Sequence, residues 1–222
     1  MPQDPTPCRP AAPIGAPGRS FGVDVGGTTV KGLRLGADGT VRGEHRVRTP
    51  APDPDGRRVA AAVLQVATAL GHSPGEPLGV ALPGVVDERA GRAVRSANLG
   101  WADVPFTGLL PPGTTLCHDV RAGAVAEARS GAARRAEGVV AFVPVGTGIA
   151  AAVLLDGIAL VAGGFAGEIG QLVLTDGPFR GLRTEEVASA ARRAGCEGAR
   201  DAAAAPGAAL LAADARTAAV AS

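Results

Sequence analysis

The chain has 222 residues, enough for one large domain or two small ones. Its formal net charge is +1, and only 3% of its residues are aromatic, with no Tyr. The near-zero net charge provides no excess of basic residues to bind a polyanion. The few aromatic residues cannot form a series of stacking platforms for single-stranded nucleic acid, so we expect no nucleic-acid binding. A core made mostly of Val, Leu and Ala, in thin layers, is expected.

The three cysteines, Cys8, Cys117 and Cys196, lie far apart, and no CxxC pair exists. This spacing argues against a disulfide framework and a four-ligand zinc site. Residues 1–19 are rich in proline and lack an apolar run, so we expect a disordered leader rather than a signal peptide. The apolar stretches are too short to cross a bilayer. A cytoplasmic protein without membrane contact is expected.

The first fifty residues contain three apolar or alternating runs separated by turns, over residues 21–25, 30–35 and 41–47. Successive strands joined by tight turns predict an antiparallel meander. Residues 57–70 predict a helix, because their apolar side chains repeat at helical spacing. Asp55 is placed to cap this helix, and Gly71 to end it.

Residues 78–82 predict a buried strand that is interrupted by Pro83-Gly84. Residues 114–117 predict another strand, which ends at His118-Asp119. A helix over about 120–129 follows it. The polar residues His118 and Asp119 therefore lie at the junction between the predicted strand and the predicted helix.

The rest of the chain continues to mix strands with helices. Strands are predicted over 139–145, over 149–155 and near Ala159, the last after a hairpin turn at Asp156-Gly157, and helices over 185–194 and 208–220. No repeat of solenoid period is present. The element pattern predicts an α/β protein with mixed sheets.

Two glycine-rich hairpins are candidates for phosphate binding. The first is Gly26-Gly27-Thr28-Thr29, preceded by Asp24, and the second is Gly146-Thr147-Gly148. Glycine lets backbone N–H groups approach an anion closely, and threonine hydroxyls donate to phosphate oxygens. Asp24 is placed to hold Mg²⁺ through water. P-loop spacing is absent, and the second hairpin leads into a strand, unlike a dinucleotide-binding fingerprint.

Either hairpin alone is compatible with an ordinary tight turn. Both together suit two lobes that bind one triphosphate. Six segments then resemble the ROK family (repressors, open reading frames, kinases), in matching order, over residues 21–31, 79–87, 96–101, 118–124, 145–149 and 166–171. The resemblance implies an actin/hexokinase-like (ribonuclease H-like) fold with two lobes. It also implies an N-terminal lobe over 20–118 and a partial C-terminal lobe over 119–222.

The resemblance implies ATP-dependent phosphorylation of a sugar hydroxyl, with Mg²⁺ and a hexose or amino sugar as partners. Asp119 matches the family's catalytic base, although an Asp at this position can also cap the helix that follows. Glu168 matches an acceptor for a sugar hydroxyl, with a solvated loop carboxylate as its alternative. Asn98 and Gly84 fall in sugar-side segments. Relatives with this fold are often dimers, so a homodimer is possible.

The chain departs from the family at residues that would bind sugar or zinc. His118 stands where an Asn is usual, and Gln171 where a zinc-binding His is usual. The cysteine-rich zinc segment expected after Leu174 is missing, so zinc is not expected. Glu185 aligns with the last sugar-contacting carboxylate, with Glu186 as the competing alignment.

The segment after Gly181 contains only isolated glycines, and the late glycine pair that would close over adenosine is not found. We therefore expect an incomplete second lobe and consider two functions. One is an active glucokinase-like sugar kinase with Asp119 as general base. The alternative is a degenerate, non-catalytic family member that binds sugar or phosphate weakly. A family repressor is not expected, because the proline-rich segment before Phe21 does not predict a helix-turn-helix.

Overall fold

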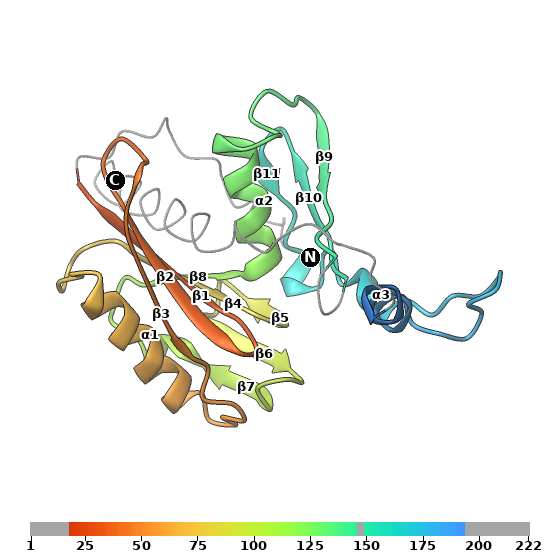
Figure 1. The fold of residues 1–222 in the computed structure, drawn as a ribbon, viewed down its shortest axis with the longest axis horizontal. Helices are drawn as coiled ribbons and strands as arrows, with labels where there is room; N and C mark the ends of the chain where they lie inside the picture. Colours follow the sequence, from red (N-terminus) through yellow and green to blue (C-terminus); the bar gives the residue numbers. More distant parts are fainter. Residues whose placement is uncertain (1–17, 146–148, 194–222) are drawn as a thin grey trace, which may run out of the picture.

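The computed structural model describes residues 18–145 and 149–193 (Figure 1). Its largest sheet has five strands in the order β3-β2-β1-β4-β8. These strands are β1 (Ser20–Val25), β2 (Thr29–Leu35), β3 (Val41–Arg48), β4 (Leu78–Leu82) and β8 (Thr115–His118). The first three pair antiparallel, which confirms the predicted meander, whereas β4 pairs parallel with both β1 and β8.

Helix α1 (Arg57–Ala69) packs against one face of this sheet (Figure 1). Its apolar stripe is buried as predicted, with Val59, Val63 and Val66 fully inaccessible. These side chains join Phe21 and Val23 of β1 in the main hydrophobic core. Burial of this stripe is the principal stabilising contribution to the helix, since isolated helices of this length are marginal in water.

The predicted capping of α1 by Asp55 is wrong. The residue at the N-cap is Gly56, without a side-chain cap. Asp55 accepts from the backbone N–H of Arg57 and forms an exposed ion pair with the side chain of the same residue. The carboxylate of Asp53 instead accepts from the N–H of Val59 at 2.8 Å. Asp53 is 2% exposed, and a desolvated carboxylate must take hydrogen bonds from the donors around it.

A second sheet of three strands, in the order β5-β6-β7, is missing from the sequence prediction. It consists of β5 (Val85–Asp87), β6 (Arg92–Ser96) and β7 (Trp101–Pro105), followed by the short helix η1 (Phe106–Gly108). Trp101 and Phe106 pack edge to face with ring centroids 4.9 Å apart, and both belong to the main core. The two sheets therefore share one hydrophobic core.

The third sheet lies on the other side of helix α2 (Asp119–Ser130) (Figure 1). Its strands are β9 (Val139–Phe142), β10 (Ala152–Leu155) and β11 (Ile158–Ala159), shorter than the predicted 139–145 and 149–155. Ala124 of α2 packs with Leu154 in a separate small core. Helix α2 thus begins at the end of β8 in the first sheet and packs on the third.

The remaining elements are η2 (Ala162–Gly164), η3 (Ile169–Gln171) and α3 (Thr184–Arg193). Residues 1–17 of the predicted leader over 1–19, the hairpin residues Gly146, Thr147 and Gly148, and the predicted helix over 208–220 lie outside the described residues. None of the helices within 18–145 and 149–193 is long and apolar enough to span a bilayer.

Candidate active site

The carboxyl ends of three parallel strands bring several predicted site residues to one edge of the large sheet. Asp24 of β1 pairs with Ala81 of β4, and Leu82 of β4 pairs with His118 of β8. Asp119 follows directly as the first residue of α2. Ligands of open α/β sheets bind at this edge, so the topology supports a site here.

The first glycine hairpin is closed by its own backbone. The N–H of Gly26 donates to the carbonyl of Thr29 at 3.0 Å, and is therefore already used within the turn. Thr49 stabilises the hairpin from the end of β3, because its Oγ1 donates to the carbonyl of Gly26 at 2.7 Å and its N–H donates to Thr28 at 3.0 Å. The sequence analysis missed Thr49, since nothing in its local sequence marks this contact.

Asn98 lies against this hairpin. A Cβ added to Gly27 would stand 4.0 Å from Nδ2 of Asn98. Asp53 fixes the loop that carries Asn98, because its N–H donates to the carbonyl of Leu99 at 2.9 Å and its carbonyl accepts from Nε1 of Trp101 at 3.0 Å. A predicted phosphate-side residue and a predicted sugar-side residue are thus neighbours.

Gly84 has a steric role that needs no ligand. Its φ is +91°, and a Cβ there would lie 2.2 Å from the carbonyl oxygen of Arg95 in β6. The turn between β4 and β5 therefore approaches the backbone of β6 so closely that only glycine fits at this position.

His118, Asp119 and Glu168 form the centre of the candidate site. The Nε2 of His118 lies 3.2 Å from Oδ1 of Asp119 and 3.6 Å from Oε1 of Glu168. The ring is 3% exposed, and its Nδ1 is buried without a hydrogen-bond partner. Burial, reinforced by the positive charge of Arg121, lowers the pKa of His118 to about 3. The imidazole is therefore neutral at physiological pH, and its single N–H belongs on Nε2, beside the two carboxylates.

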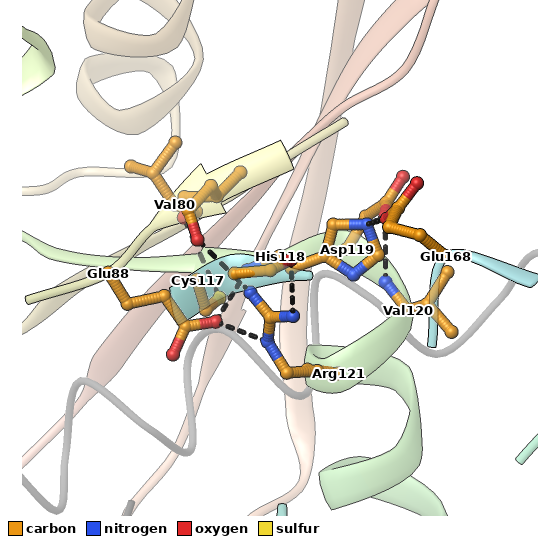
Figure 2. A network of polar contacts seen from close by, with 10 residues as sticks. Val80, Glu88, Cys117, His118, Asp119, Val120, Arg121 and Glu168 are labelled. Atoms are coloured by element: carbon orange, nitrogen blue, oxygen red, sulfur yellow. Dashed lines mark hydrogen bonds and ion pairs between the residues drawn. The ribbon is translucent and has the colours of Figure 1, made fainter. Parts of the chain in front are cut away.

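Asp119 stands at the N-terminus of α2, where the helix dipole stabilises an anion. Its Oδ1 accepts from the N–H of Val120 at 2.7 Å. The N-cap residue of α2 is His118, without a side-chain cap bond, so Asp119 does not cap the helix as the alternative interpretation expects. Its carboxylate lies instead on the same side of the His118 ring as Glu168, and both are near Nε2 (Figure 2).

Glu168 is half-buried rather than a solvated loop carboxylate, with 24% of its side chain exposed. Burial raises its pKa, the negative charge of Glu185 raises it further, and the positive charge of Arg121 opposes both. The loop is fixed by Gly167, whose φ is +92° and whose added Cβ would lie 1.7 Å from the carbonyl oxygen of Ala151. The N–H of Ala151 donates to Gly167 at 2.8 Å.

Gln171 and Glu185 are brought together at the edge of the site. Nε2 of Gln171 donates to Oε2 of Glu185 at 2.9 Å, and Nη1 of Arg183 donates to Oε1 of Gln171 at 3.2 Å. Glu186 instead accepts from the backbone N–H of Arg183 at 2.6 Å. Of the two competing carboxylates, Glu185 is thus the one beside Gln171. The described residues contain no group of three or more His, Cys, Asp or Glu side chains arranged to hold a metal ion.

Two charged residues that the sequence analysis missed lie directly behind His118. The guanidinium of Arg121 donates through Nε to Oε1 of Glu88 at 2.7 Å, and the same oxygen accepts from the backbone N–H of His118 at 2.9 Å. Arg121 is 2% exposed. In Figure 2, Glu88 and Arg121 lie on one side of His118, and Asp119 and Glu168 on the other. A charged residue in a short helix gives no sequence signal for such burial.

Comparison with known proteins identifies the family to which the chain belongs. The ROK family matches residues 20–200. The polyphosphate glucokinase of Mycobacterium leprae is 32% identical over 146 residues, which cover 63% of this chain and 44% of that protein. The chain spans about half the length of the curated relatives that it matches.

Solved structures agree with this assignment. The inorganic polyphosphate/ATP-glucomannokinase from Arthrobacter sp. strain KM aligns with a TM-score of 0.66 and 31% identity, over 81% of this chain and 72% of that one. A ROK family glucokinase from Streptomyces griseus, in complex with glucose and AMPPNP, aligns with a TM-score of 0.61 and 26% identity, over 75% of this chain and 55% of that one. The fold is the actin/hexokinase-like fold of these kinases, and the chain belongs to the ROK family.

Proposed function

We propose that the chain phosphorylates a hydroxyl group of a hexose, with Asp119 as the general base. The observation that carries this proposal is the contact of His118 with both Asp119 and Glu168, at the edge of the sheet where β1, β4 and β8 end. The names of the relatives, a polyphosphate glucokinase, a glucomannokinase and a glucokinase, support a hexose as the acceptor.

The roles of the carboxylates follow from their surroundings. Phosphoryl transfer needs a carboxylate that accepts the proton of the attacking hydroxyl, and Asp119 is held in place by the N–H of Val120 and by His118. Glu168 accepts a hydrogen bond from a second sugar hydroxyl, which fixes the orientation of the ring. Asn98, Gln171, Glu185 and the backbone at Gly84 complete the proposed sugar site.

The phosphoryl donor would bind at the two glycine hairpins, the first over 26–29 and the second over 146–148. Asp24 is the penultimate residue of β1, just before the first hairpin, and is 8% exposed. Its Oδ2 lies 4.0 Å from Nζ of Lys31. A single carboxylate at this position fits a hard cation bound through water. Mg²⁺ would neutralise charge on the donor phosphates there. We place the boundary between the two lobes at residue 118.

The donor is either ATP or inorganic polyphosphate. ATP follows from the glycine hairpins and from the AMPPNP bound to the Streptomyces griseus relative. Polyphosphate follows from the names of the Mycobacterium leprae and Arthrobacter relatives. Both donors are therefore needed in any test of activity.

The proposal is tested by incubating the protein with each donor, Mg²⁺, and glucose, mannose, fructose or N-acetylglucosamine. Formation of sugar phosphate is followed by ³¹P NMR, with Asp119→Asn as the control. Product from the wild type that the variant fails to make supports the proposal. If neither donor gives product with any sugar, the kinase proposal is wrong. A rise in Tm with sugar but without turnover would instead support the non-catalytic alternative.

A further inference from the structure

We propose that Glu88 and Arg121 are positioning residues, which together set the placement of Asp119 relative to Glu168. The inference rests on the proposed kinase function, because these two carboxylates are its base and its sugar acceptor. Neither Glu88 nor Arg121 needs to touch substrate. Both act through the backbone segments that carry the carboxylates.

Arg121 connects three segments that are distant in the sequence. Besides its bond to Glu88, its Nη2 donates to the carbonyl of Val86 in β5 at 3.3 Å, and its Nη1 donates to the carbonyl of Gly164 in η2 at 3.4 Å. Gly164 lies one turn before Glu168. The planar guanidinium offers donors in fixed directions, and a lysine head cannot reproduce this geometry.

Glu88 fixes the other carboxylate. Its Oε1 accepts from the N–H of His118, the residue directly before Asp119, and from Nε of Arg121. One oxygen therefore joins the end of β8 to the guanidinium that binds the η2 loop. The ion pair is largely removed from water, since Arg121 is 2% exposed and the Glu88 side chain 16%. Breaking a buried pair leaves an uncompensated charge, so both partners are needed.

The position of the loop also depends on close backbone packing. A Cβ at Gly164 would lie 2.6 Å from the carbonyl oxygen of Val86, the same carbonyl that accepts from Arg121. The η2 loop thus lies directly on β5, and Arg121 donates to a carbonyl on each side of this contact. If the guanidinium is removed, the loop loses its hydrogen bond at Gly164 and with it the fixed distance to α2.

The test is a comparison of steady-state constants for Arg121→Lys and Glu88→Gln. Misplacement of reacting groups by about 1 Å can cost roughly a hundredfold in rate. We expect Arg121→Lys to lower kcat at least about tenfold and to raise the KM for sugar by a similar factor. The KM for the donor should stay within about twofold, because the bonds described for this pair go to His118, Val86 and Gly164 and not to the hairpin at 26–29. Glu88→Gln should change kcat and the KM for sugar in the same directions but by smaller factors, and it should likewise leave the KM for the donor unchanged.

The control is Arg92→Lys, which alters an exposed ion pair with Asp103 on the β6–β7 hairpin, with an N–O distance of 2.6 Å. This variant should leave all constants at the wild-type level. A purely structural role of Arg121 would reduce the amount of active protein and would leave both KM values unchanged. Wild-type KM values for sugar in both Arg121→Lys and Glu88→Gln would overturn the inference.

Hydrogen exchange provides a readout that does not depend on turnover. Amides over 117–121 and over 164–169 should both exchange faster in Arg121→Lys and in Glu88→Gln, while those of α1 keep their protection. Faster exchange in only one of the two segments, or in neither, contradicts the inference. If the wild type itself makes no sugar phosphate, the proposed function fails, and the exchange data alone decide whether this pair joins the two segments.

Discussion

The Nε2 atom of His118 lies 3.6 Å from Oε1 of Glu168, although His118 precedes α2 in the sequence and Glu168 follows it by many residues. The same nitrogen lies 3.2 Å from Oδ1 of Asp119. A neutral imidazole has one N–H to offer there, so two carboxylates face one donor.

The burial of His118 predicts a pH dependence of stability. Its pKa is about 3 in the folded protein, below the ordinary value of 6.5. The unfolded chain therefore binds more protons between pH 6.5 and about 3, and the free energy of unfolding falls as pH falls through this window. The slope is at most about 1.4 kcal/mol per pH unit.

This slope is measured by urea unfolding of the wild type and of His118→Asn at several pH values between 4 and 7. The raised pKa of Glu168 gives a contribution of the opposite sign, but its causes are burial, Arg121 and Glu185, which the substitution retains. We expect the stability difference between the two proteins to change with pH in favour of the variant at acidic pH. A difference that is constant with pH contradicts the neutral buried ring.

Glu168→Gln should weaken sugar binding selectively. A hydrogen bond to a charged group contributes about 1.5–3 kcal/mol, so we expect the KM for sugar to rise roughly tenfold to a hundredfold, with the KM for the donor unchanged. As the pH is lowered, protonation of Glu168 removes the hydrogen-bond acceptor and the KM for sugar rises. Because the pKa of Glu168 is raised, this rise should begin at a higher pH than an ordinary glutamate would give. Initial rates across pH 4.5 to 8 test this, and a variant with the same pH profile would contradict the role of Glu168.

Gly167→Ala should destabilise the protein far more than Gly177→Ala. Both glycines have positive φ, +92° and +77°, which costs an L-residue about 1–2 kcal/mol. Only at Gly167 does the added Cβ also meet a carbonyl oxygen, at 1.7 Å, whereas Gly177 has nothing within 4 Å. Thermal unfolding measures the two effects, and equal losses of Tm would show that the loop adapts without cost.

Asp53→Ala should lower stability by about 1–2 kcal/mol through loss of the bonds to the first turn of α1. Asp55→Ala is the matched control, since that carboxylate is exposed and bonds only locally. We expect it to cost less than about 0.5 kcal/mol. Urea midpoints of the two variants measure these losses, and a larger loss of stability for Asp55→Ala than for Asp53→Ala would contradict this assignment of the capping bonds.

Buried strands were the part of the fold that the sequence determined best. The strand Leu78–Leu82 is buried along its whole length, so its apolar run is unambiguous. Strands β5 to β7 are short and carry charged residues such as Arg92 and Asp103 on an exposed face, which makes them look like loop. Their formation depends on packing of Trp101 and Phe106 into a core assembled from distant segments.

For the site, residue types were predictable, but contacts were not. The motifs single out His118, Asp119 and Glu168, and the structure brings all three together. The hydrogen bonds of Arg121 reach partners 33 and 43 positions away, which no local pattern encodes. A buried arginine becomes visible only when the carboxylate and carbonyls that compensate its charge are placed around it.

The loop that carries Glu168 touches two different sheets through glycine. Gly164 lies on the carbonyl of Val86 in β5, and Gly167 on the carbonyl of Ala151, just before β10. Rotation of one sheet away from the other must separate one of these two contacts, so the loop can follow only one partner. Glu168 would therefore travel with whichever side keeps its glycine contact, and its observed place 3.6 Å from His118 requires both contacts.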